Sequence, residues 1–200
     1  NWEEIVARDD IHAVIIATPN VFHPPIAIAA ARAGKHILSE KPLALNAADA
    51  AEMAAKADKA DVRHMTAFTY RFVPAMRYLH HLIKQGDAGM IYHYRSCRLQ
   101  DWGTRNVGWR QQRKMAGTGE IGDMLSHRID FGRHLIGEYK RLVTSLVNHT
   151  PVRDGAPNDT DDWVGLLGEF VTGTTAFMES SKLASGVNES WRSPDRVELN

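Results

Sequence analysis

The chain has 200 residues, of which 44% are apolar, and its 24 lysines and arginines are balanced by 24 aspartates and glutamates. This length and composition suffice for one large or two small globular domains. Because the net charge is zero, there is no global field to attract nucleic acid or an anionic membrane, so we expect neither partner and expect a small neutral ligand instead.

The first predicted elements are a strand, a helix and a second strand. Residues 13–17 read Ala-Val-Ile-Ile-Ala, an unbroken apolar run typical of a strand that is buried on both faces of a parallel sheet. A helix is expected from Pro24-Pro25 to Gly34, and residues 36–38 form the next strand. This order predicts a βαβ unit with a right-handed crossover.

A second unit of the same kind follows. Asn46 is a suitable N-cap for an alanine-rich helix over residues 47–60, and residues 62–68 are a plausible strand. A doubly wound sheet needs more βαβ units than these, so we expect the first domain, residues 1–70, to be incomplete.

After Phe72 the pattern changes to one long helix, residues 74–86, followed mainly by strands. This change predicts a second domain of the α+β type over residues 71–200. Residues 151–162, rich in Asp, Asn, Gly and Pro, are expected to form a surface loop. The strands are expected at residues 90–99, 141–147, 162–170 and 174–183.

Residues 117–122 satisfy the pattern GxGxxG, but this pattern indicates dinucleotide binding only where a buried strand runs into a helix. The preceding residues 109–116 are not such a strand. We therefore interpret this segment as a turn that leads into a helix.

The helix after this turn carries acidic residues and histidines on one stripe. Asp123, His127, Asp130 and His134 follow one another at spacings of four, three and four residues. The stripe fits a solvated helix face, an imidazole oriented by a carboxylate for proton transfer, or a set of divalent-metal ligands. Without a third ligand cluster in the sequence, acid–base chemistry is favoured over metal binding. The apolar residues expected on the opposite, buried side are Ile121, Leu125, Ile129 and Ile136.

Residues 39–42, Ser-Glu-Lys-Pro, lie just past a predicted parallel strand. Open α/β sheets bind ligands at this carboxyl edge. Lys41 could donate a hydrogen bond to a substrate oxygen there, although a lysine in a surface turn is also commonplace.

Together these motifs resemble the Gfo/Idh/MocA family, which includes glucose-fructose oxidoreductase, inositol dehydrogenase and the rhizopine-catabolism dehydrogenases. The first motif combines residues 13–20 and His23 with residues 33–43, Ala-Gly-Lys-His-Ile-Leu-Ser-Glu-Lys-Pro-Leu. The second, residues 117–130, is a glycine-rich turn followed by Asp, three residues, His, two residues and Asp. The resemblance covers nearly the whole chain and indicates a family without indicating a substrate.

The resemblance implies an α/β fold in which an incomplete Rossmann-type parallel-sheet domain precedes an α+β domain with a large, mostly antiparallel open sheet. In this family the open sheet often forms a subunit interface, so we expect a homodimer or homotetramer. The resemblance also implies NAD or NADP as cofactor and a sugar, inositol or related polyol as substrate.

The resemblance assigns Lys41, Asp123 and His127 to catalysis and, together with Asp130, to substrate binding. It places the cofactor beside Thr18, Pro19, Asn20, His23, Glu40, Lys41, Trp109 and Arg110.

The chemistry of these residues agrees with oxidation of a secondary alcohol without a metal ion. His127 would be the general base, because an imidazole titrates near neutrality. Asp123 would orient the ring and stabilise its cationic form. Lys41 would stabilise the developing alkoxide or polarise the carbonyl in the reverse direction.

Two other functions remain open at this stage. A metal-dependent hydrolase or isomerase could use the Asp and His stripe and would lose activity with a chelator. A regulatory protein could bind sugar or cofactor without turnover, although the intact Lys41, Asp123 and His127 argue against that.

The compartment follows from the single cysteine, Cys97, which cannot form an intramolecular disulfide and favours a reducing environment. No apolar run approaches the roughly 20 residues that a transmembrane helix needs. We therefore expect a cytoplasmic protein, although the start at Asn1 leaves an export signal further upstream possible.

Overall fold

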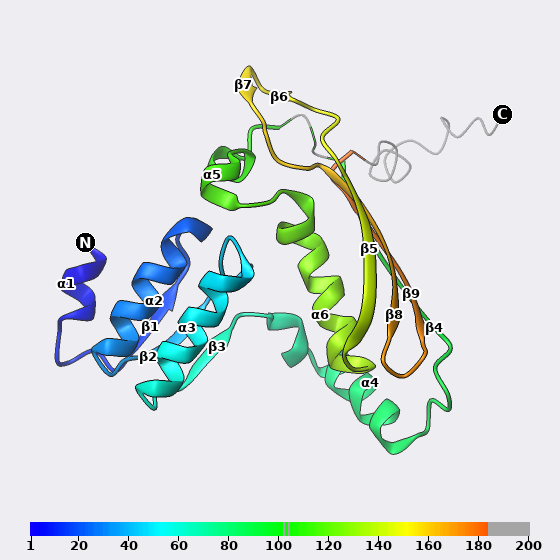
Figure 1. Ribbon diagram of the computed structural model, residues 1–200, viewed down its shortest axis with the longest axis horizontal. Helices are drawn as coiled ribbons and strands as arrows, with labels where there is room; N and C mark the ends of the chain where they lie inside the picture. Colours follow the sequence, from blue (N-terminus) through cyan, green and yellow to red (C-terminus); the bar gives the residue numbers. More distant parts are fainter. Residues whose placement is uncertain (102, 104, 184–200) are drawn as a thin grey trace.

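A computed structural model describes residues 1–101, 103 and 105–183, which fold into two lobes (Figure 1). No helix among these residues combines the length and the apolar character needed to cross a membrane.

The first lobe is built on a parallel sheet with the strand order β1-β2-β3. Helices α2 and α3 pack against each other and both lie on one face of this sheet, as Figure 1 shows. The elements of this lobe are α1 (Trp2–Val6), β1 (Ala13–Ile16), η1 (Asn20–Phe22), α2 (His23–Arg32), β2 (His36–Ser39), α3 (Ala47–Lys59) and β3 (His64–Thr66).

Local signals define the ends of these helices as expected. Prolines occupy the first turn of α2, and Gly34, just beyond its end, has a φ of 70°, which glycine adopts without steric cost. The Asn46 side chain caps α3 by accepting a hydrogen bond of 2.9 Å from the Asp49 backbone N–H. The two predicted βαβ units are thus confirmed.

The expectation that the first strand is buried on both faces is wrong for the described residues. Val14 and Ile16 are buried beneath the helices, whereas Ile15 is 74% exposed on the opposite face. Both crossovers run in the same direction across the sheet, so right-handedness places α2 and α3 on the same side.

The second lobe contains a four-stranded sheet with the order β4-β9-β8-β5. β4 runs parallel to β9, and the other pairs are antiparallel. The predicted combination of a Rossmann-type parallel sheet with a second, mostly antiparallel sheet is therefore confirmed. The strands are β4 (His93–Leu99), β5 (Tyr139–Val147), β8 (Trp163–Phe170) and β9 (Thr175–Ser181), with a small ribbon of β6 (Val152–Arg153) and β7 (Ala156–Pro157).

Helix α6 covers the inner face of this sheet, where Leu166 and Met178 pack in a buried cluster with Leu125. Ile121, Ile129 and Ile136 pack against the same cluster, as the helical spacing predicts. The helical segments of the lobe are η2 (Thr69–Phe72), α4 (Pro74–Gln85), η3 (Gly108–Gln111), α5 (Arg113–Ala116), the π-helical turn η4 (Ile121–Leu125) and α6 (Ser126–Leu135).

The prediction of a surface loop at residues 151–162 is only partly right. The tip of the β6–β7 ribbon is exposed, but Arg153 and the run Asn158, Thr160, Asp161 and Asp162 are buried. The asparagine, threonine and aspartate side chains of this set bond to backbone groups, and Arg153 Nη2 donates to Asp162 Oδ2 at 3.4 Å. The division between residues 70 and 71 stays a prediction, and residues 184–200 lie outside the described part of the chain.

Candidate active site

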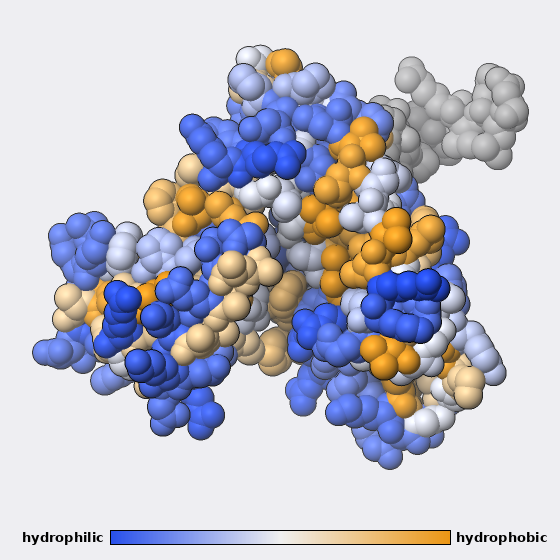
Figure 2. Space-filling model, viewed as in Figure 1, coloured by the Kyte–Doolittle hydropathy of each residue, from blue (hydrophilic) through white to orange (hydrophobic). Residues whose placement is uncertain are grey.

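A cleft of about 520 Å³ lies where the carboxyl ends of β1 and β2 face the turn before η4. The space-filling view shows a recess between the two lobes (Figure 2). The location agrees with the expected ligand-binding edge of a parallel sheet. The cleft is lined by Ala17, Thr18, Asn20, Glu40, Lys41, Pro42, Trp109, Arg110, Ala116, Thr118, Gly119, Asp123 and Lys182.

Lys41 and Asp123 meet across this cleft from opposite lobes. The Lys41 Nζ donates to Asp123 Oδ1 at 3.1 Å and also to the Asp123 backbone carbonyl. Their side chains are 15% and 19% exposed, so the pair is shielded from bulk water but still reaches the cleft. The structure thus brings together two residues that the sequence placed in separate motifs.

Asp123 is held as an anion by two lysines. Burial by itself would raise the pKa of Asp123, but Lys41 and then Lys182 outweigh burial and lower it below its ordinary value. Lys182 Nζ lies 3.7 Å from Asp123 Oδ2, so each carboxylate oxygen has its own cation. At neutral pH the site therefore contains a fixed negative charge between two positive ones.

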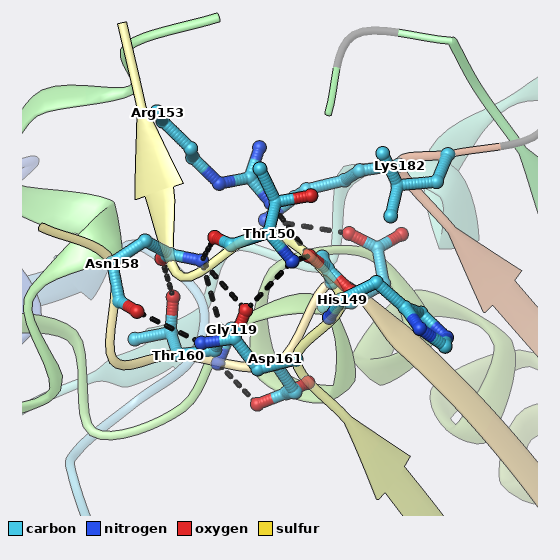
Figure 3. A network of polar contacts seen from close by, with 12 residues as sticks. Gly119, His149, Thr150, Arg153, Asn158, Thr160, Asp161 and Lys182 are labelled. Carbon is cyan, nitrogen blue, oxygen red and sulfur yellow. Dashed lines mark hydrogen bonds and ion pairs between the residues drawn. The ribbon is translucent and has the colours of Figure 1, made fainter. Parts of the chain in front are cut away.

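Asp161 anchors the turn that carries Asp123 (Figure 3). Its carboxylate accepts hydrogen bonds from the backbone N–H groups of Gly119, at 2.7 Å, and Ile121, at 2.9 Å. An anionic side chain at these N–H groups satisfies donors that would otherwise be unpaired at the start of a helix. A Cβ at Gly119 would lie 1.9 Å from the Asp161 carbonyl oxygen, so this close approach requires glycine.

This geometry confirms that the GxGxxG pattern is a turn entering a helix. The segment before it forms η3 and α5 instead of a buried strand. The N–H groups of Gly119 and Ile121, which a phosphate would need, are bound to Asp161.

Six of the residues expected to contact the cofactor line the cleft. The Thr18 hydroxyl is buried there without a hydrogen-bond partner among the described residues, so it has a free donor and acceptor for a ligand. Trp109 and Arg110 stack, with the guanidinium carbon 4.5 Å from the ring centroid. The Asn20 side-chain amide already donates a hydrogen bond of 2.9 Å to the Ala116 carbonyl, so only part of its hydrogen-bonding capacity is left for a ligand. The six residues are Thr18, Asn20, Glu40, Lys41, Trp109 and Arg110.

His23 and Pro19, which were also expected beside the cofactor, are not among the lining residues. His23 is fully buried, and its ring nitrogens lie 3.0 Å from the Thr18 carbonyl oxygen and 3.1 Å from that of Pro42. It therefore ties the loop after β1 to the turn after β2 and supports the cleft from behind. Pro19 is the N-cap residue of the short helix η1.

His127 is buried beside the cleft rather than in its lining. Its ring packs edge-on against Tyr70, with centroids 4.9 Å apart, and against Phe68 at 5.9 Å. Burial, followed by the charges of Lys41 and Arg128, lowers the pKa of His127 to about 4. The expectation that Asp123 orients this ring is not met in this structure: the Asp123 carboxylate faces Lys41, and His127 Nδ1 is buried without a partner among the described residues.

Asp130, the third member of the stripe, forms an ion pair with Arg71. Arg71 Nε donates to Asp130 Oδ2 at 2.8 Å, and its Nη2 donates to Oδ1 at 2.5 Å, in a two-pronged contact. Asp130 is buried and absent from the cleft lining, so its expected contact with substrate hydroxyls remains a prediction without support from this geometry.

The stripe as a whole does not converge on one point. Asp123 faces Lys41, Asp130 faces Arg71, and His134 stacks on His80 with ring centroids 4.1 Å apart. Among the described residues, no three His, Cys, Asp or Glu side chains are grouped so that they could hold a metal ion.

Sequence reasoning missed Lys182, the cleft residue at the end of β9. Its Nζ lies 3.4 Å from Glu120 Oε2, and both side chains are almost completely buried. A single lysine after a strand carries no local pattern, so only the fold brings it to Asp123. The polar run Glu-Ser-Ser-Lys at residues 179–182, in an otherwise buried strand, was the available signal.

Comparisons with known proteins agree with this architecture. Residues 1–68 match the oxidoreductase family with an NAD-binding Rossmann fold, and residues 76–199 match the Gfo/Idh/MocA C-terminal domain. The chain belongs to the Gfo/Idh/MocA oxidoreductase family. The resemblance inferred from the two motifs is thereby confirmed, as is a nicotinamide dinucleotide as the cofactor of the family's first domain.

Several relatives in this Gfo/Idh/MocA family are named for sugar chemistry. Levoglucosan dehydrogenase of Pseudarthrobacter phenanthrenivorans is 35% identical over 94% of this chain and 54% of its own length. The 1,5-anhydro-D-fructose reductase of Ensifer adhaerens is 32% identical over 89% of this chain and 55% of its own length. A levoglucosan dehydrogenase structure in complex with NADH and levoglucosan superposes with a TM-score of 0.88 at 38% identity, over 93% of this chain and 52% of the other.

The chain therefore spans about half the length of the curated relatives it matches.

Proposed function

We propose that the full-length protein is an NAD- or NADP-dependent oxidoreductase acting on a secondary hydroxyl or carbonyl group of a sugar, inositol or related polyol. The observation that carries the proposal is the Lys41–Asp123 pair at the carboxyl edge of the parallel sheet, inside a cleft of about 520 Å³. The sugar dehydrogenases and reductases among the relatives support the substrate class.

The residues present in the cleft fit a nicotinamide dinucleotide. The unpartnered Thr18 hydroxyl and the Glu40 carboxylate offer hydrogen bonds to ribose hydroxyls, and the stacked Trp109 and Arg110 offer a flat surface to a ring. When bound, the cofactor supplies or accepts the hydride.

Lys41 acts on the substrate oxygen in this proposal. Its ammonium group has three donors, and the two contacts to Asp123 leave one for a ligand in the cleft. A fixed cation at this position stabilises the negative charge that develops on the oxygen during oxidation, and it polarises the carbonyl during reduction.

His127 receives the hydroxyl proton. Its pKa of about 4 differs from the near-neutral value expected of an imidazole, so the ring is neutral at physiological pH and can accept a proton, but as a weaker base than free imidazole. Asp123 contributes through Lys41, whose ammonium group it holds in place.

The complete protein should be screened with levoglucosan, other anhydrosugars, aldoses and inositols, using NAD and NADP and following nicotinamide absorbance. Lys41→Ala and His127→Ala should each lower turnover by about 10²- to 10⁴-fold, while Lys59→Ala and His81→Ala, which alter exposed residues away from the cleft, should not. Near-normal turnover in both site variants would refute these roles. Tight NADH binding without turnover of any substrate would indicate a regulatory protein instead.

We also propose that the protein forms a homodimer or homotetramer through the outer face of the second sheet. No described helix covers this face, and Val143 and Leu167 are paired across β5 and β8 there with 71% and 60% of their surface exposed. Apolar residues also gather along this lobe in Figure 2. Exposed apolar surface of this kind commonly marks a protein interface.

We propose that the protein is located in the cytoplasm. Cys97 is a free, exposed thiol, which is compatible with the reducing conditions of the cytoplasm.

A further inference from the structure

Four charged side chains form a continuous row from the cleft into the second lobe. Lys41 contacts Asp123 at 3.1 Å, Asp123 lies 3.7 Å from Lys182, and Lys182 lies 3.4 Å from Glu120. The charges alternate in sign, so every member lies beside an opposite charge. The first two members were assigned to catalysis above, and the last two have no assigned role.

Burial increases along this row. The Lys41 and Asp123 side chains are 15% and 19% exposed, Lys182 is 2% exposed, and Glu120 is not exposed at all. Charges that are removed from water interact strongly, and a buried charge is costly unless it is paired. The inner pair is therefore removed from water more completely than the outer pair that it supports.

We propose that Lys182 and Glu120 are positioning residues for the Lys41–Asp123 pair, with Lys182 fixing the second oxygen of the Asp123 carboxylate and Glu120 anchoring Lys182. The proposal rests on the proposed function for its kinetic consequences, but its geometric consequence is independent of that function.

Both residues are attached to rigid parts of the fold. The Lys182 backbone N–H donates to the Asp162 carbonyl at 2.9 Å, and the Glu120 backbone N–H donates to the Asp161 carbonyl at 2.9 Å. The Glu120 side chain also accepts a hydrogen bond from the Ser180 hydroxyl. Figure 3 shows Lys182 pointing toward the network that holds the Gly119 turn.

This arrangement explains why Asp123 is turned toward Lys41. Without Lys182, one carboxylate oxygen would face a buried region containing the Glu120 carboxylate, and like charges would repel. With Lys182 between them, the second oxygen of Asp123 is satisfied, and the first is directed at the cleft. Lys41 is then held where it can meet a substrate oxygen.

Glu120 also gives the row a titratable group. Burial raises the pKa of Glu120 to about 7, although Lys182 and the Ser180 hydrogen bond lower it and Asp123 raises it. Arg153 on β6 faces it as well, since Glu120 is one of the charges that act on this arginine. Protonation of Glu120 near neutral pH leaves Lys182 with Asp123 as its acidic partner.

The test compares Lys182→Met with Lys35→Met in the complete protein. Lys35 is a matched control, because it is a buried lysine whose Nζ donates to the Arg8 carbonyl at 2.7 Å, at the opposite end of β2 from the cleft. We expect Lys182→Met to lower kcat by about 10- to 100-fold, as is typical when a group that orients a metal ligand is removed, with a small effect on KM. Lys35→Met should leave kcat unchanged.

Crystal structures give a readout that does not depend on turnover. In Lys182→Met we expect the Asp123 Oδ1 to Lys41 Nζ distance to exceed about 4 Å, the limit for an ion pair, whereas Lys35→Met should keep the contact. An unchanged Asp123 side chain in Lys182→Met would overturn the proposal. If the wild type turns over no sugar with either cofactor, the proposed function fails and these structures still decide the positioning role.

Two further variants separate positioning from a purely structural role. Lys182→Met leaves Glu120 buried and unpaired, so Lys182→Met/Glu120→Gln should regain much of the stability lost in the single variant. We expect kcat to stay low in this double variant; recovery of kcat together with stability would overturn the proposal. Glu120→Gln alone should remove an inflection near pH 7 from the plot of kcat/KM against pH. If the inflection persists in this variant, the positioning role of Glu120 is contradicted.

Discussion

Lys41 and Asp123 are 82 positions apart in the sequence, yet their contact joins the two lobes at the point where the chemistry is proposed. Each was identifiable because it lies in a motif with fixed neighbours. Lys182 lies outside both motifs, and Glu120 lies within residues 117–130 without any signal of its own, because the importance of both depends on the packing of β9 against the turn before η4. At the residue scale, the candidate catalytic residues were predictable and the charged residues that support them were not.

His127 makes stability depend on pH. The pKa is about 4 in the folded state and near 6.5 when the chain is unfolded, so the unfolded state binds this proton first as pH falls. The contribution of neutral His127 is complete above pH 6.5 and is lost as pH falls toward 4. Between pH 7.5 and 5 the loss amounts to about 2 kcal/mol.

We therefore expect His127→Phe, which keeps the packing against Tyr70 and Phe68, to lose about 2 kcal/mol less stability than the wild type between pH 7.5 and 5. Chemical denaturation of the complete protein at both pH values measures the difference. His81→Phe, at an exposed position on α4, should behave like the wild type. The same loss in wild type and His127→Phe would show that this imidazole is not buried in its neutral form.

At the scale of elements, the turn that presents Asp123 depends on a distant segment. The π-helical turn η4 widens the start of the helix. Asp161, about 40 positions further along the chain, accepts hydrogen bonds from the N–H groups of Ile121, the first residue of η4, and of Gly119 just before it. Single π-helical turns are frequently found at functional sites. A helix that began with ordinary α geometry would present Asp123 at a different angle to Lys41.

Most elements were predictable because their signals are local. Asn46 caps α3 and Gly86, with a φ of 84°, ends α4, and each needs only its sequence neighbours. The buried part of residues 151–162 could not be predicted in this way. Its Asp, Asn, Gly and Pro content is typical of exposed loops, and its burial results from partners such as Gly119 that only the fold brings near.

Asp161→Asn tests this anchoring. The amide keeps the shape of the side chain but presents an NH₂ group to one of two backbone donors, so we expect a loss of about 1.5–3 kcal/mol in the free energy of unfolding. We also expect a lower kcat/KM, because Asp123 shifts with the turn. Denaturation and steady-state kinetics measure the two effects.

The matched control is Asp154→Asn, since Asp154 is exposed at the β6–β7 tip and asparagine accepts its positive φ of 47°. This variant should match the wild type in both measurements. Wild-type stability and kcat/KM in Asp161→Asn would mean that other contacts determine the position of the turn.

For the whole molecule, the cleft and the outer sheet face lie on different sides of the second sheet. The cleft is assembled from both lobes, with Asn20 bonded to the Ala116 carbonyl and Lys41 bonded to Asp123. The outer face carries a row in which Val143, Leu167 and Phe177 are paired across three strands. The proposed catalytic site and the proposed assembly surface can therefore be altered separately.

Leu167→Glu tests the assembly. In a contact with two-fold symmetry the same patch is used by both subunits, so one substitution places two carboxylates in the interface. Each carboxylate would lose water without gaining a cation, which opposes association. We expect a wild-type dimer to become a monomer, or a wild-type tetramer to become a smaller assembly, as measured by light scattering after size-exclusion chromatography.

Val171→Glu is the matched control, because Val171 is 68% exposed but lies in the turn between β8 and β9 rather than on the row. It should keep the wild-type mass, and both variants should keep the wild-type kcat per subunit, since neither residue lines the cleft. An unchanged mass in Leu167→Glu, or a monomeric wild type, would contradict the interface. A monomer that also lost kcat would show instead that the outer face of the sheet and the Lys41–Asp123 pair on its other side are coupled.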